Sequence, residues 1–128
     1  MEQDLEQRLV IFEREGLAAP AIVAFVRQIL EWLEREAQCP GDEEHMGPLA
    51  SHLLLALERV RRGEDLGSAW SPLVHEEAST LTVLPHLQDW AGQIRAQALQ
   101  QLDLRLPAEE EDFLLLHLGA LVLRGQEP

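Results

Sequence analysis

Apolar residues recur three and four positions apart along most of this chain, and this spacing limits the folds that it can form. Side chains spaced in this way lie on one face of an α-helix, which has about 3.6 residues per turn. Ile22, Val26, Ile29 and Leu33 show the pattern clearly. No run of useful length alternates apolar and polar residues, as a half-buried strand would. The sequence therefore predicts an all-α fold.

Prolines and glycines divide this pattern into a compact bundle of five to six helices. Pro20, Pro48 and Pro72 suit first helical turns, where the missing N–H costs nothing, while Gly16 and Gly63 suit helix ends. The expected helices cover residues 2–15, about 20–38, 48–63, a short stretch from 72, 86–102, and a last segment reaching about 124. The expected connections are a surface loop over 39–45, a connector over 64–69, and a loop or helix end over 80–84.

The length of 128 residues fits a single domain, 1–128, with its core over about 20–124 and an N-terminal helix over 2–15. With 46% hydrophobic and 26% charged residues, the composition is that of a globular protein. The formal net charge of −13 disfavours direct binding to nucleic acid or to anionic membranes, because both surfaces attract lysine and arginine.

The N-terminus lacks the layout of a signal peptide, and no apolar run is long enough to span a bilayer. Cys39 is the only cysteine, so an internal disulfide is impossible and a reducing compartment is consistent. These features indicate a cytoplasmic protein.

Two aliphatic segments each contain one histidine. The segment Gly47–Gly63 contains His52 and Arg59, and the segment Leu106–Leu121 contains His117 after an acidic opening. His52 and Arg59 share a helical face, so the arginine could meet an anion carried by the imidazole. Taken singly, each histidine is most simply a partly buried, neutral residue of a packed helix.

Metal binding and hydrolytic catalysis have little support in the sequence. His45 and His52 are spaced so that they would lie on one helical face, but Gly47 and Pro48 are expected to break the helix between them. No HExxH pattern occurs in the sequence. His45, His75 and His86 are expected at the surface or in loops. Cys39 has no evident base, and glycine-flanked nucleophiles are missing. We expect no metal, no cofactor and no enzymatic activity.

The two histidine segments together resemble a known regulatory family. The run SHLLLALER, residues 51–59, is similar to the first signature of the phosphotransferase-system regulation domain (PRD): Asp-His-Ile, an aromatic or aliphatic residue, Ala, Ile, any residue, Arg. The run LPAEEEDFLLLHL, residues 106–118, resembles the second signature: Leu-Pro, an acidic pair, an apolar run, then histidine. The spacing of the two histidines is also about that of the family.

The resemblance implies an all-helical, commonly dimeric module that is phosphorylated on histidine. The donor is the histidine-carrier phosphoprotein or the phosphocarrier component of a sugar permease, and phosphorylation changes dimer packing and an attached transcriptional output. By position, His52 and His117 would be the phosphoacceptors. Arg59 matches the family's arginine, and Glu110 its second acidic position. Ser51 stands where the family usually has aspartate; it can form hydrogen bonds but supplies no charge.

Modules of this family usually occur in tandem, fused to an RNA- or DNA-binding domain, for which this chain has no room. The first hypothesis is therefore a stand-alone, antiterminator-like regulatory module, phosphorylated by phosphotransferase-system components, which acts on transcription or transport through a protein partner. The second is a helical dimerisation or adaptor module that keeps the PRD fold without the phosphate chemistry. The near-continuous leucines of both histidine segments predict a homodimer.

Overall fold

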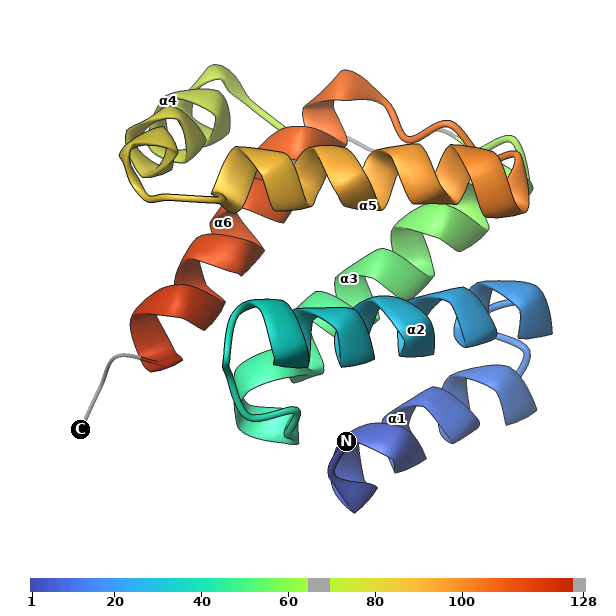
Figure 1. Cartoon of the computed structure of the whole chain (residues 1–128). Helices are drawn as coiled ribbons and strands as arrows, with labels where there is room; N and C mark the ends of the chain where they lie inside the picture. Colours follow the sequence, from blue (N-terminus) through green and yellow to red (C-terminus); the bar gives the residue numbers. More distant parts are fainter. Residues whose placement is uncertain (65–69, 126–128) are drawn as a thin grey trace.

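The computed structural model describes residues 1–64 and 70–125, and these residues confirm the all-α prediction (Figure 1). They form six α-helices and one short 3-10 helix, with no strand in the described ranges. The helices are α1 (Gln3–Arg14), α2 (Pro20–Glu36), α3 (Glu43–Arg61), α4 (Pro72–Thr80), η1 (Leu81–Val83), α5 (Leu87–Leu102) and α6 (Ala108–Gly125).

Helix α3 lies at the centre of the packing, in contact with α1, α2 and α6. Helices α2 and α5 cross the face shown in Figure 1 one above the other, while α4 packs on α6. The two histidine segments are therefore neighbours, because His52 lies on α3 and His117 on α6.

The core follows the apolar spacing of the sequence. Seven apolar side chains of α2 are buried: Ile22, Val23, Phe25, Val26, Ile29, Leu30 and Leu33. Leu5 and Leu9 of α1 are fully buried in the same cluster, so the N-terminal helix contributes to the common core. Burial of aliphatic side chains of this size contributes about 1.5–3 kcal/mol each.

The predicted start of the central helix is wrong, because α3 begins at Glu43 and contains Pro48. Asp42 caps the helix by accepting the backbone N–H of His45 at 2.8 Å, and acidic residues in the first turn suit the helix dipole. Pro48 has no N–H for the Glu44 carbonyl one turn earlier. Arg124 of α6 donates to this carbonyl instead, at 2.6 Å. A tertiary contact thus replaces the hydrogen bond that the proline removes.

Other helix ends agree with the sequence. Gly16 has a φ of +69°, as expected after α1, and Ser71 caps α4 through a bond from the Val74 N–H at 3.4 Å. Residues 80–84, expected to be either a loop or a helix end, form a helix end that contains η1. Residues 65–69 of the expected connector lie outside the described part of the chain. Within that described part, no helix is both long enough and apolar enough to cross a membrane.

Candidate functional site

A cavity of about 370 Å³ lies between α3 and α6, and it brings together four of the five residues that the sequence singled out. The four are His52, Arg59, Glu110 and His117; the cavity is also lined by Leu55, Ala56 and Phe113. The histidine segments are far apart in the sequence, but both direct their polar side chains into this one space. The shared helical face expected for His52 and Arg59 is therefore observed.

His52 is bound by a carboxylate from the other helix. Its Nε2 lies 2.6 Å from Oε2 of Glu110, and because a carboxylate accepts hydrogen bonds, the imidazole N–H is the donor. The Glu110 side chain is 5% exposed and the His52 side chain 24% exposed. The short distance and the low exposure fix the orientation of the His52 ring.

His117 packs directly against His52, with 4.9 Å between the ring centroids and 35° between the ring planes. Burial, together with nearby His52, lowers the pKa of the His117 imidazole to about 4, while Glu110 opposes the shift. A histidine with this pKa is neutral at physiological pH and keeps a lone pair on one ring nitrogen. The cavity therefore contains one imidazole bound to a carboxylate and one held neutral by its surroundings.

Phe113 and Leu55 form the apolar part of the cavity wall. The Phe113 ring centroid is 5.4 Å from that of His52, and Leu55 remains 39% exposed at the cavity. The structure turns Phe113 to the cavity and buries its neighbour Leu114 in the core. The sequence carried no signal for Leu55, because it lies in an unbroken run of leucines.

Ser51 lies away from the cavity, on the side of α3 that faces α1. Arg8 of α1 donates to the Ser51 hydroxyl at 2.5 Å and pairs with the Glu43 carboxylate. Gly47 lets this contact form, because a Cβ at that position would lie 2.8 Å from Oε1 of Glu43. Ser51 therefore joins α1 to α3, and the carboxylate on His52 comes from Glu110.

The other three histidines lie outside the cavity. The expectation for His45 is wrong, because it is a half-buried residue of α3 whose Nδ1 lies 2.7 Å from Asp42; Gly47 and Pro48 do not break the helix between His45 and His52. His86 is exposed and stacks on Trp90. Across residues 1–64 and 70–125, no three His, Cys, Asp or Glu side chains meet as a metal site would require.

A polar cluster between α4 and α6 had no signal in the sequence. Asp112 is buried and accepts the indole N–H of Trp70 at 2.8 Å, while Nδ1 of His75 lies 3.0 Å from the same carboxylate oxygen. The His75 side chain is otherwise 63% exposed. This cluster fixes α4 and Trp70 against α6, about half a helical turn from Glu110.

The leucines that predicted a homodimer are mostly internal. Leu53, Leu54, Leu57, Leu114, Leu115 and Leu118 are all buried in the core. Their number is explained by packing on several sides of α3 and α6, because each helix contacts more than one neighbour. The homodimer remains a prediction, and it needs another surface.

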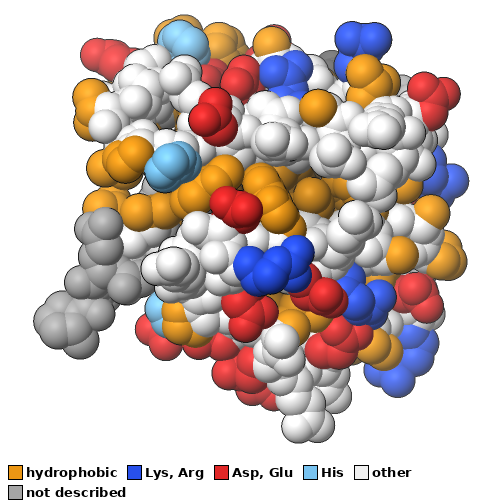
Figure 2. Space-filling view, in the orientation of Figure 1, with side chains coloured by type: hydrophobic (Ala, Val, Ile, Leu, Met, Phe, Trp, Pro, Cys, Tyr) orange, Lys and Arg blue, Asp and Glu red, His pale blue; other side chains and the backbone are white. Residues whose placement is uncertain are grey.

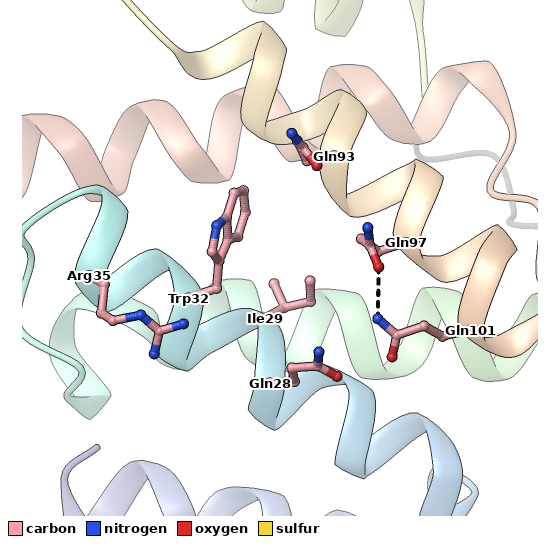
Figure 3. A pocket seen from close by; sticks show the side chains of 7 residues that line it. All are labelled: Gln28, Ile29, Trp32, Arg35, Gln93, Gln97 and Gln101. Atoms are coloured by element: carbon pink, nitrogen blue, oxygen red, sulfur yellow. Dashed lines mark hydrogen bonds between the residues drawn. The ribbon is translucent and has the colours of Figure 1, made fainter.

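A groove between α2 and α5 offers such a surface (Figure 3). It encloses about 260 Å³ and is lined by Gln28, Ile29, Trp32, Arg35, Gln93, Gln97 and Gln101, with the glutamines of α5 facing the α2 side chains. Figure 2 shows a band of hydrophobic side chains along this boundary. None of the described residues that line the groove is acidic, in a chain whose net charge is −13.

Sequence comparison finds a distant homologue. The chain is 28% identical over 123 residues to the uncharacterized protein YhfY of Escherichia coli (strain K12), and the match spans 96% of this chain and 98% of YhfY. No family model matches the chain, and no solved structure matches it. The resemblance of residues 51–59 and 106–118 to the PRD signatures therefore supports a proposal about function and assigns no family.

Proposed function

We propose that this protein is a PRD-like regulatory module that accepts a phosphoryl group on histidine from components of the sugar phosphotransferase system. The observation that carries the proposal is the convergence of His52, His117, Arg59 and Glu110, from two distant segments, on one partly open cavity. A nucleophilic nitrogen, an orienting carboxylate and a cation for the product are the groups that phosphoryl acceptance needs.

His52 can act as the acceptor through Nδ1. When Nε2–H donates to Glu110, the lone pair of the neutral ring lies on Nδ1 and can attack phosphorus. The N–P bond of the donor breaks as the new N–P bond forms, and positive charge develops on the imidazole. Glu110 stabilises this charge at 2.6 Å, much as a buried carboxylate supports the histidine of a catalytic triad. Glu110 thus takes the role of the aspartate that Ser51 replaces.

Phosphorylation of the cavity changes its charge enough to alter the state of the whole module. A phosphoryl group adds roughly two negative charges and strong acceptor oxygens to a cavity that Arg59 lines. One charge-assisted hydrogen bond contributes about 1.5–3 kcal/mol, whereas nearly complete conversion between two states requires roughly 5 kcal/mol. Two such bonds in the phosphorylated state contribute about 3–6 kcal/mol, a range that includes the requirement for a switch. In this proposal, phosphorylation changes how the module binds a protein partner, and that partner acts on transcription or transport.

The test is incubation with phosphoenolpyruvate, enzyme I and the histidine-carrier phosphoprotein, or with a permease phosphocarrier component. Intact mass is then measured without acid, because phosphohistidine is acid-labile. We expect phosphorylation of the wild type that is lost or sharply reduced in whichever of His52→Ala and His117→Ala removes the histidine that these donors phosphorylate. His75→Ala is the matched control, since His75 is exposed and lies outside the cavity. Unmodified wild type with every donor would refute the proposal.

Glu110→Gln separates the proposed chemistry from mere packing. The amide has the size of the carboxylate but cannot stabilise positive charge on His52, so we expect roughly 10- to 100-fold slower phosphorylation. The fold should persist, which circular dichroism can check. An unchanged rate in a folded Glu110→Gln variant would remove Glu110 from the mechanism.

The second candidate is a homodimeric adaptor module without phosphate chemistry. Its support is the α2/α5 groove, where a second copy can approach without meeting acidic side chains in the described lining. Dimerisation is compatible with the first candidate as well. Light scattering at high micromolar concentration tests it. We expect Gln97→Glu to weaken the dimer by placing two carboxylates near each other, whereas Gln100→Glu, on the same helix but outside the groove, should leave it intact.

A further inference from the structure

The two candidate acceptor histidines occupy one site. Their ring centroids are 4.9 Å apart, one ring on α3 and the other on α6, and both rings line the same cavity. A phosphoryl group on either ring therefore lies within a few ångströms of the other ring. The resemblance places the two residues in separate signatures and implies that both are phosphoacceptors.

The charges around this site suit one phosphoryl group better than two. Glu110, 2.6 Å from His52, already contributes a carboxylate to the cavity. Among the described residues of the lining, Arg59 is the one arginine or lysine. Two phosphoryl groups would bring roughly four further negative charges to one guanidinium. Like charges at this separation, in a site partly removed from water, repel strongly.

We propose that His52 and His117 form a single acceptor centre that holds one phosphoryl group at a time; this rests on the proposed function. In each event the donor's N–P bond breaks, its electron pair returns to the donor, and one imidazole lone pair forms the new bond. When His52 is the acceptor, neutral His117 keeps one N–H, which it donates to the phosphoryl oxygens; when His117 is the acceptor, the N–H of His52 stays on Glu110. Donors that act at either histidine therefore compete for the same centre. The module has two states, one with this centre phosphorylated and one with it unphosphorylated.

The experiment counts phosphoryl groups with a donor that needs no carrier protein. Phosphoramidate phosphorylates accessible histidines directly, so the background is a full-length variant with His45→Gln, His75→Gln and His86→Asn, which leaves only His52 and His117. Asparagine suits position 86, where φ is +74°. We expect one phosphoryl group per chain, and a doubly modified species below about a tenth of the singly modified one.

Further variants in this background locate the group. His52→Gln keeps a donor for Glu110, and it and His117→Gln should each still accept one group, whereas the double variant should accept none. If the background variant is unfolded by circular dichroism, peptide mapping of phosphorylated wild type replaces it: the occupancies at His52 and His117 should sum to no more than one. Accumulation of two groups on folded protein would overturn the single centre.

The same reagent separates this inference from the proposed function. One group from phosphoramidate but none from the phosphotransferase proteins would support the single centre and refute the proposed donor. Two groups from both sources would support the proposed function and overturn the single centre. No modification of His52 or His117 by either source would overturn both.

Discussion

The depressed pKa of His117 makes folding stability depend on pH in a calculable way. The folded-state pKa is about 4, whereas the unfolded imidazole titrates near its ordinary value of about 6.5. Between these values the unfolded chain binds more protons, so stability rises with pH. This contribution is complete above about pH 6.5 and is lost as the pH falls towards 4. From about pH 7.5 to about pH 4.5, the loss attributable to His117 is roughly 2.5 kcal/mol.

The measurement is urea unfolding of wild type and His117→Gln at both pH values. We expect the difference in unfolding free energy between the two proteins to change by roughly 2.5 kcal/mol, because the amide does not titrate. His86→Asn serves as the matched control, since His86 is exposed and lies outside the cavity. Parallel pH profiles for wild type and His117→Gln, or an NMR titration of His117 near pH 6.5, would refute the burial argument.

Two further predictions concern Glu58 and Arg124, whose hydrogen bonds connect α3 to the start of α2 and to α6. Glu58 on α3 is buried, accepts the Ala19 N–H at the start of α2, and has its pKa lowered to about 2 chiefly by a hydrogen bond from Arg61. Glu58→Gln should therefore lower the free energy of unfolding near pH 7 by about 2 kcal/mol, whereas a loss below about 0.5 kcal/mol would show the carboxylate to be dispensable. Arg124→Ala should lower the free energy of unfolding by about 1 kcal/mol in wild type. The loss should be smaller in a Pro48→Ala background, because residue 48 then regains its N–H. Equal losses in a double-mutant cycle would show that Arg124 does not replace the missing bond.

Much of the fold could be predicted because local sequence determines helices. Apolar spacing identified the helices, and Pro72 and Gly16 marked two of their ends by a first-turn proline and by left-handed backbone. The start of α3 could not be predicted by the same rules. A proline usually marks a first turn, and only the contact of Arg124 with the Glu44 carbonyl, from residues far apart in the chain, makes Pro48 compatible with the helix interior.

The sequence predicted the main residues of the site but not the contacts between them. The two segments identified four residues of the cavity, but the Glu110 contact to His52 depends on how α3 and α6 pack. Ser51, next to His52 in sequence, faces α1 because adjacent helical residues point in different directions. The leucines from which a homodimer was predicted are mostly buried, because a helix with several neighbours buries more than one side.

The sequence by itself determined the all-α class, most helix boundaries and the residue types available for chemistry, since these depend on local spacing and side-chain type. The tertiary structure decided which of those residues meet. It placed the rings of His52 and His117 next to each other, placed Glu110 rather than residue 51 on His52, and lowered the pKa of His117 by burial. Contacts and desolvation arise only when helices distant in sequence pack together, and no local pattern encodes them.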